Sequence, residues 1–442
     1  MSDNREKAIL DEIYRSIDAK IENSIQDAPR SRPPRRPPQR PSKKDRKPPW
    51  LGMAVCLLLL AGVVFALWKS GQGEPVIAET QPPTEPLPTT GSTVVTVAAG
   101  GDVNITKELL DAARRPDGSY DFSGYFLHAA PLLSRADLAI VNLEANFTAN
   151  PVDAATRNAP ASLAAALAGS GVDVVQTANS YSIESGLAGL SSTMETIARA
   201  GMKTAGTSAT EADYAKNKGV TMVEVQGVKI ALVAFTKGVG NLNLPDGSEH
   251  CVNLLYKDYA STYTKVDREG IQAVLDAAQA QNPDITIALL HWGSEYDGVV
   301  SDTQEQIRKL MFDGGVDAII GTHSHLVGEL LLEEGGGFTA YSLGNLTGTD
   351  SDGGARQSII LQLEFTKNNE TGETNLTNYS YTPIYLASPE QSPAGMYQIL
   401  NTGNEIALYE QNYYTCVSEK TYNTLTQSKA DVERLVHPPK DE

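Results

Sequence analysis

From residue 93 onward, short apolar runs rich in β-branched residues alternate with longer segments of helical periodicity. The apolar runs occupy residues 93–99, 137–143, 172–178, 228–235, 284–292 and 316–321. The helical segments occupy residues 160–171, 185–201, 268–281 and 303–315. This alternation predicts an α/β domain with a largely buried, layered sheet.

Beyond residue 350 the pattern changes. Residues 356–365 and 377–386 alternate between apolar and polar side chains, which is typical of strands. We therefore assign residues 93–350 to the main domain and expect residues 351–442 to supply strands that complete or cover it.

Polar residues follow five of the apolar runs where each run ends. Two of the six histidines in the chain stand at the end of one run, in the stretch IIGTHSH. In α/β sheets, ligands bind where strands end and loops begin. The residues at these ends are Asp102, Asn142, Glu144, Asn179, Ser180, His291, His323 and His325.

This set of side chains predicts a metal site. Imidazole, carboxylate and amide groups without a thiolate suit a divalent ion such as Mn, Fe or Zn, and two such ions would bind a phosphate-like oxygen or activate a water. A single Asp or Glu at a strand end is often only a cap or an ion-pair partner, but five coincidences in one sheet favour a shared site. We interpret the other histidines, His128, His250 and His437, as structural or exposed.

Six motifs resemble, in order and spacing, those of the capsule-synthesis CapA proteins, which are poly-γ-glutamate biosynthesis proteins related to the calcineurin-like metallophosphoesterases. The motifs are GDVNIT, ADLAIVNLE, ANSYSIESG, LLHWGSEY, IIGTHSHLV and YSLGN, and the resemblance covers residues 93–350. The resemblance implies a four-layer α/β/β/α metallophosphoesterase-like sandwich, membrane attachment, and a role in the synthesis, export or anchoring of an anionic surface polymer.

The resemblance also implies roles for individual residues. The ligands of one or two divalent ions would be Asp102, Glu144, Ser180, His291, His323 and His325. Tyr181 and His291 would be catalytic, and the substrate would contact Asn142, Asn179, Trp292, Glu295 and Asn345.

Three residues depart from the family pattern. Family members commonly read Ala-Asn-Asn-His where this chain has Ala-Asn-Ser180-Tyr181, and Asn104 replaces a histidine that follows the first aspartate. A serine hydroxyl is a poor metal ligand, and a tyrosine, with an ordinary pKa of about 10, is a weak acid at neutral pH. Two functions therefore remain open: a metal-dependent hydrolase or transferase acting on an amide or phosphoester bond, or a non-catalytic component that binds the polymer or its synthase subunits.

An uncharged run of nineteen residues, Trp50 to Trp68, predicts one transmembrane helix before the domain. At about 1.5 Å per residue it spans roughly 28 Å, close to the thickness of the hydrocarbon core, and a tryptophan stands at each end. A buried soluble helix or a cleaved signal peptide is the alternative, but a signal peptide would not normally follow so long a leader, and no A-x-A site follows. Residues 28–47 hold nine basic residues against one acidic residue, so we expect a cytoplasmic N-terminus and an extracellular body.

The segments on either side of this run have distinct compositions. In residues 1–27, isoleucines recur every four residues, which predicts a helix whose apolar stripe either meets a partner or the inner membrane surface, or has no specific partner. Residues 28–49 form a basic, proline-rich linker that we expect to lie on anionic lipid, and we expect no nucleic acid partner. Residues 69–92 form a Pro/Thr-rich extracellular spacer.

Charge and cysteine content add two expectations about the body. Residues 1–47 contain 13 basic and 8 acidic residues, so the remainder carries 23 basic against 46 acidic residues, a balance of −23. A body this acidic repels a polyanion unless bound cations or a local basic cleft offset the repulsion.

Cys251 and Cys416 either form one disulfide or remain free, and the sequence does not decide between these alternatives.

Overall fold

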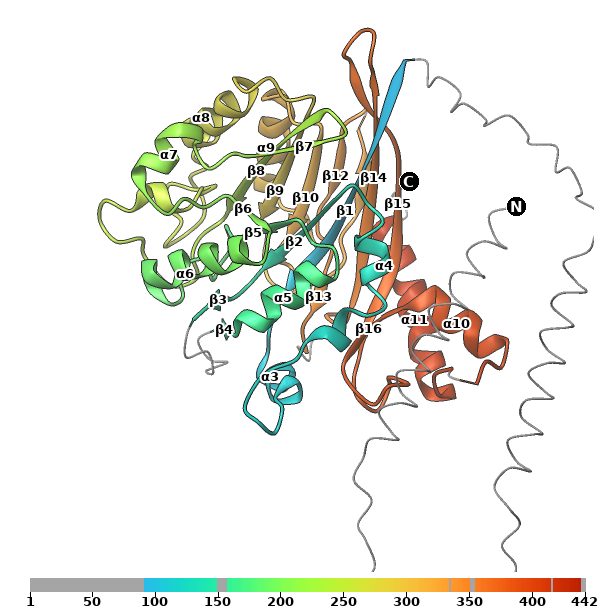
Figure 1. Cartoon of the computed structure of the whole chain (residues 1–442). Helices are drawn as coiled ribbons and strands as arrows, with labels where there is room; N and C mark the ends of the chain where they lie inside the picture. Colours follow the sequence, from blue (N-terminus) through green and yellow to red (C-terminus); the bar gives the residue numbers. More distant parts are fainter. Residues whose placement is uncertain (1–90, 149–156, 334, 350–353, 415, 439–442) are drawn as a thin grey trace, which may run out of the picture. The chain divides into compact units, whose positions relative to one another are not determined.

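The computed structural model describes residues 91–148, 157–333, 335–349, 354–414 and 416–438 (Figure 1). Two β-sheets form the centre of this part of the chain. The predicted cytoplasmic helix, basic linker, transmembrane helix and spacer lie outside the described residues. Among the helices that are described, none has both the length and the apolar character needed to cross a bilayer.

The first sheet has the strand order β16-β15-β14-β1-β2-β5-β6, and β13 also pairs with β1. Strands β1, β2, β5 and β6 run parallel to one another, as does β13 to β1, whereas β14, β15 and β16 pair antiparallel. The strands are β1 (Ser92–Val103), β2 (Leu138–Leu143), β5 (Val174–Gln176), β6 (Lys203–Ala205), β13 (Asn345–Thr347), β14 (Gln357–Asn368), β15 (Thr374–Ala387) and β16 (Gln398–Asn401).

The second sheet has the order β11-β12-β10-β9-β8-β7. Its central strands β8, β9, β10 and β12 are parallel, and the edge strands β7 and β11 are antiparallel. The strands are β7 (Thr221–Val225), β8 (Val228–Thr236), β9 (Ile285–His291), β10 (Ala318–Thr322), β11 (Leu330–Leu332) and β12 (Phe338–Ala340). A separate short pair joins β3 (Asn146–Phe147) and β4 (Asn158–Ala159).

The two sheets pack face to face, and helices cover their outer faces. Because side chains alternate along a strand, Val95 and Val97 of β1 join Leu232 and Leu289 of the second sheet in the central core, whereas Ala98 faces the helices outside. The outer face of the first sheet packs against α3 (Lys107–Ala113), α4 (Ala130–Leu133), α5 (Ala161–Gly169) and α6 (Gly186–Arg199). The outer face of the second packs against α8 (Arg268–Gln279) and α9 (Asp302–Asp313). The layers therefore follow the expected α/β/β/α order.

The C-terminal strands are integral to the first sheet. Strand β14 pairs with β1 from Ser92 opposite Asn368 to Ala99 opposite Leu361, so it lies beside the strand that opens the domain. The helices α10 (Thr402–Glu410) and α11 (Glu419–Val436) lie next to β14–β16 (Figure 1). Short helices α7 (Glu211–Asn217), η1 (Ser123–Phe126) and η3 (Glu249–Cys251) complete the described elements.

The two cysteines of the body are both free thiols. Cys251 is buried and Cys416 is partly exposed. Of the two alternatives that the sequence left open, the structure therefore has the unpaired one.

Candidate metal centre

The register of the first sheet places three polar residues side by side. Asp102 of β1 pairs with Asn142 of β2 on one side and with Asn345 of β13 on the other. Glycine at position 101 allows this, because a Cβ there would lie 1.8 Å from the carbonyl oxygen of Gly344. Any side chain at that position would force β1 and β13 apart and separate the three residues.

Strands of the second sheet end at the same place. His291, the last residue of β9, pairs with Thr236 of β8 and with Thr322 of β10. The Nδ2 atom of Asn142 in the first sheet lies 3.4 Å from Nδ1 of His291. The carboxyl ends of the two sheets therefore meet, and the polar residues that follow them form one buried cluster.

The turn after β10 brings two further imidazoles into this cluster. His323 and His325 have φ angles of 94° and 61°, a region that residues other than glycine rarely adopt. The backbone N–H of His323 donates to Oδ2 of Asp102 at 3.2 Å, and its ring centroid lies 4.4 Å from that of His291. Strained backbone of this kind is concentrated at functional sites, so the two φ values support a functional role for the turn.

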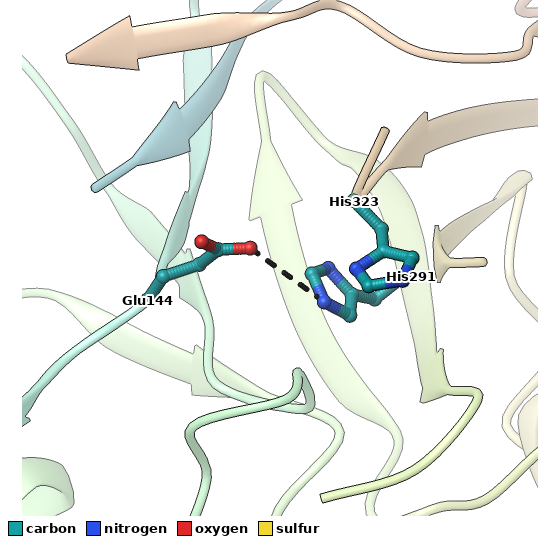
Figure 2. Close-up of side chains that lie close together, drawn as sticks. All are labelled: Glu144, His291 and His323. Carbon is teal, nitrogen blue, oxygen red and sulfur yellow. Dashed lines mark ion pairs between the residues drawn. The ribbon is translucent and has the colours of Figure 1, made fainter. Parts of the chain in front are cut away.

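Glu144 lies at the centre of the cluster. Its Oε1 is 3.6 Å from Nε2 of His291, and its Oε2 is 3.9 Å from Nε2 of His325 (Figure 2 shows the first pair, with His323 beside it). Neither carboxylate oxygen has a hydrogen-bond partner, although the side chain is 1% exposed. A buried carboxylate normally has such partners, so this one is available to a ligand.

Two sets of possible metal ligands share this glutamate. One set is Glu144, His291 and His323, and the other is Asp102, Glu144 and His325; in each, the ligand atoms lie within 4.8 Å of one another. The Nδ1 atom of His323 is also buried without a hydrogen-bond partner. Both sets use the residue types that bind borderline divalent ions.

Surrounding side chains orient two of the imidazoles. Nδ1 of His291 lies 3.1 Å from Oγ1 of Thr322, and Nδ1 of His325 lies 2.9 Å from Oδ1 of Asn345. Because the amide nitrogen of Asn345 donates to the carbonyl of Ala355, its oxygen is the atom that faces His325 and must accept. Nδ1 of His325 therefore carries the proton, and its Nε2 is left to act as a ligand, an arrangement common around metal-binding histidines.

The electrostatics of the cluster also favour a cation. Burial, and then the nearby Asp102 carboxylate, raise the pKa of Glu144, because two carboxylates close together in a dry site repel each other. Burial lowers the pKa values of His291 and His323 well below the ordinary value, so both imidazoles are neutral, as metal ligands must be. Burial opposes protonation of His325, but the carboxylates of Glu144 and Asp102 outweigh it and raise its pKa to about 10. Without a metal, Nε2 of His325 therefore carries a proton, and a bound cation would replace that proton. The residues present fit a divalent ion.

The predicted residues of the ANSY stretch have different positions. Oγ of Ser180 lies 3.2 Å from Nε2 of His291, so this hydroxyl is part of the cluster. The amide nitrogen of Asn179 donates to Asn142 Oδ1 and to the carbonyl of Leu143, and its oxygen accepts from the backbone N–H of Tyr181. Both ends of the Asn179 amide are thus engaged within the protein, and the geometry gives it the task of holding the turn rather than contacting substrate.

Trp292 is the predicted substrate contact that the structure places elsewhere. It is 1% exposed, its indole Nε1 donates to the carbonyl of Tyr341 at 3.0 Å, and its ring stacks on Tyr341 in the core beneath α8 and α9. The physical reason is strand alternation: since His291 faces the cluster, the next side chain faces the opposite side. Asn142 and Asn345, also predicted to bind substrate, are buried and hydrogen-bonded to Asp102 and His325, respectively.

An open cleft of about 570 Å³ adjoins the cluster. Of the predicted residues, it is lined by Ser180, Tyr181, Glu295 and His323. Burial raises the pKa of Tyr181 to about 12, so its phenol stays protonated at neutral pH and can donate a hydrogen bond.

Two cations near the cleft were not predicted. Lys237 lines it directly after β8, with its ammonium 4.5 Å from the ring centroid of Tyr263. The rule that polar residues at strand ends form the site could have found this lysine. Arg157 contacts Asn104 and Tyr181 beside the cluster. It stands in an irregular segment, and no sequence pattern indicated it.

Comparisons with known proteins agree with the motifs. The chain is 28% identical over 220 residues to the PGA biosynthesis protein CapA of Bacillus subtilis (strain 168), a match that covers 50% of this chain and 52% of that protein. It is 24% identical over 343 residues to the capsule biosynthesis protein CapA of Bacillus anthracis, covering 74% of this chain and 75% of that protein. The chain thus spans about half the length of the first of these relatives.

Solved structures give weaker similarity. A phosphatase from Mycoplasma pneumoniae matches with a TM-score of 0.40 at 14% identity, covering 66% of this chain and 94% of that one. A structure described as a 5′-nucleotidase from Staphylococcus aureus matches with a TM-score of 0.41 at 12% identity, covering 67% of this chain and 55% of that one. TM-scores this low support no conclusion about this chain.

The family model described as bacterial capsule synthesis protein PGA_cap matches residues 96–349, which is more than half of the chain and confirms the resemblance drawn from the motifs. The chain belongs to the PGA_cap family of bacterial capsule synthesis proteins.

Proposed function

We propose that this protein acts in the synthesis, export or anchoring of an anionic capsular polymer of the poly-γ-glutamate type, and that its cleft binds one or two divalent metal ions. Family membership and the functions named for the two relatives support the first part. The second part is carried by one observation: Glu144 is buried, both of its carboxylate oxygens lack hydrogen-bond partners, and it belongs to two ligand sets at once.

The proposed ligands are Asp102, Glu144, His291, His323 and His325, with Ser180 as a weak additional ligand. When bound, divalent ions of this type polarise a substrate oxygen or lower the pKa of a bound water. The protein's own residues would hold this arrangement: Thr322 and Asn345 fix two imidazoles, and Asn142 donates to Asp102 at 2.7 Å. Such outer contacts typically change metal affinity about ten- to a hundredfold when they are removed.

On this proposal, the cleft is metallophosphoesterase-like and acts on an amide or phosphoester bond as a hydrolase or transferase. Tyr181, which lines the cleft, would donate a hydrogen bond to the substrate, and the Lys237 ammonium would attract anionic groups. Neither Tyr181, with a pKa of about 12, nor a neutral buried His291 is an efficient general acid at neutral pH.

That last observation favours a second candidate function, a non-catalytic component of a capsule synthase complex that binds the polymer through its metal site. Tyr181 and Asn104 stand where the family pattern has histidines. Release of phenol from an aryl phosphate by the metal-loaded protein would support the enzyme. Binding of a γ-linked glutamate oligomer without any turnover would support the binding component.

Metal analysis of the purified full-length protein tests the proposal directly. We expect at least one Mn, Fe or Zn per chain and a large loss of metal when His291, His323 and His325 are all changed to alanine. Wild-type metal content and thermal stability in that triple variant would contradict the shared site. Change of the partly exposed His250 to alanine serves as the control, because it removes an imidazole that belongs to neither ligand set.

We further propose that residues 50–68 anchor the protein in the cell membrane, with residues 1–47 in the cytoplasm and the acidic body outside. The uncharged run and the basic block on one side of it support this topology. Protease added to intact cells should degrade the body and spare the N-terminal segment. Digestion of the N-terminal segment instead would reverse the orientation.

A further inference from the structure

The two positions at which family histidines are replaced are contacted by one arginine. Nη1 of Arg157 donates a hydrogen bond to Oδ1 of Asn104, and its guanidinium carbon lies 5.0 Å from the ring centroid of Tyr181. Asn104 is fully buried two residues after Asp102, and Tyr181 lines the cleft. Arg157 therefore contacts one residue that is close in sequence to a proposed ligand and one residue that lines the cleft.

Among the described residues, no close carboxylate neutralises the charge of this arginine. Within the described part of the chain, no Asp or Glu oxygen lies within 4.0 Å of a guanidinium nitrogen of Arg157. Its field nevertheless reaches the site, because it favours the ionised forms of Glu144 and of Glu184.

The contacts that the described residues make with Arg157 engage only some of the N–H donors of its guanidinium. A guanidinium has five N–H donors in a fixed plane, and Asn104 and Tyr181 engage only part of them. Stacking on an aromatic ring fixes the plane of the group, which reduces the entropy lost when it binds a second partner. Oxyanions that present two neighbouring oxygens, above all carboxylates and phosphates, match this fork.

We propose that Arg157 is a specificity-determining residue that binds an oxyanion of the substrate beside the metal cluster. The inference rests on the proposed function and names its substrate class: a molecule that carries a carboxylate or phosphate group next to the reacting bond. Lys237 lines the same cleft and adds a second positive charge, against the acidic Glu184 and Glu295. Because the body carries a formal net charge of −23, a polyanion can approach it only where local cations offset the repulsion.

The test compares Arg157→Gln with Arg157→Lys in the full-length protein loaded with Mn²⁺. Glutamine keeps an amide that can reach Asn104 but removes the charge, and lysine keeps the charge but loses the planar fork. Calorimetric titration with inorganic phosphate and with a short γ-linked glutamate oligomer measures the affinity. Loss of a charged hydrogen bond typically weakens binding roughly ten- to a hundredfold, so we expect that loss in the glutamine variant and a smaller one in the lysine variant.

Arg199→Gln is the matched control, because Arg199 is exposed on α6 and also donates to a single uncharged oxygen, Oγ1 of Thr196. We expect it to bind both probes as the wild type does. A loss confined to phosphate would assign the oxyanion to a phosphorylated precursor, and a loss that includes the oligomer would assign it to the polymer; both support the role of Arg157.

Three results separate failure of this inference from failure of the proposed function. Wild-type affinity for both probes in Arg157→Gln, or no binding of either probe by the wild type, would overturn the role of Arg157. Absence of bound metal in the wild type would contradict the proposed function alone, because phosphate affinities of wild type and variant can still be compared. A melting temperature measured for each variant shows whether it is folded, and the lysine variant provides the comparison if the glutamine variant is not.

Discussion

Glu144→Gln is the change that most directly tests the metal centre. Glutamine has the size of glutamate but no negative charge, so the change removes one ligand from both sets without opening a cavity. In the metal-free protein the wild-type carboxylate is buried without a hydrogen-bond partner. Leaving a buried polar group unsatisfied costs about 1–3 kcal/mol, and more when it is charged. We therefore expect the metal-free variant to be at least as stable as the metal-free wild type.

The metal-loaded proteins should differ in the opposite direction. At a metal concentration of about 100 times Kd, binding stabilises the wild type by about 2.7 kcal/mol. If the variant binds about a hundredfold more weakly, the same concentration stabilises it by only about 0.4 kcal/mol. With roughly 2 °C of melting temperature per kcal/mol for a domain of this size, metal should raise the wild-type Tm by about 5 °C and that of the variant by about 1 °C.

Differential scanning fluorimetry with and without Mn²⁺ measures both effects in one experiment. Glu195→Gln is the control, since Glu195 is exposed on α6 and its loss should leave the metal-induced shift unchanged. If Glu144→Gln destabilised the metal-free protein and kept the full metal-induced shift, Glu144 would be a structural residue and the argument from its unpaired oxygens would fail.

Three further changes test other parts of the structure. Ser180→Asn with Tyr181→His should raise metal stoichiometry and aryl phosphate hydrolysis, measured by elemental analysis and phenol release; unchanged stoichiometry would show that Ser180 does not limit metal binding. Gly321→Ala should lower stability by roughly 3 kcal/mol or more, as backbone clashes of this severity do, because its Cβ would lie 2.1 Å from the carbonyl oxygen of Tyr341; a denaturant midpoint equal to wild type would refute this. Burial raises the pKa of Glu405 from 4.5 to about 7, so the stability that its proton contributes is complete below pH 4.5 and is lost as the pH rises through 7. Glu405→Gln should therefore be more stable than the wild type by roughly 3 kcal/mol at pH 8. At pH 4.5 the two proteins should be equally stable, and urea titrations at both pH values measure the difference.

Much of the metal cluster could be predicted because parallel strands end at one edge of a sheet. The apolar runs that precede Asp102, Glu144 and His291 are easily recognised as strands, and the polar residues that follow them meet where the two sheets meet. The strand pattern alone could not predict that the cluster needs two sheets rather than one, and only the family resemblance implied two sheets. The packing of the central core decides that, and it depends on contacts between residues far apart in the chain.

The residues assigned wrongly or missed have separate physical causes. Trp292 was predicted from the family resemblance to contact substrate, yet the two-residue period of a strand turns it to the face opposite His291. The part played by Asn179 depends on a turn whose hydrogen bonds no local pattern reveals. Arg157 reaches the site from an irregular segment, and long side chains from such segments are placed by tertiary contacts alone.

The replaced residues share one chemical property, and it bears on the choice between the two candidate functions. Every proposed ligand other than Ser180 keeps the residue type of the family pattern, whereas the two histidine positions hold Asn104 and Tyr181, with Arg157 in contact with both. A histidine gains or loses a proton near neutral pH, but an amide does not titrate, an arginine stays charged, and burial raises the pKa of Tyr181 to about 12. Oxyanion binding beside the metal should therefore vary little between pH 6 and 9, while proton transfer to a leaving group lacks an efficient donor. This combination favours a cleft that holds an anionic chain over one that cleaves it.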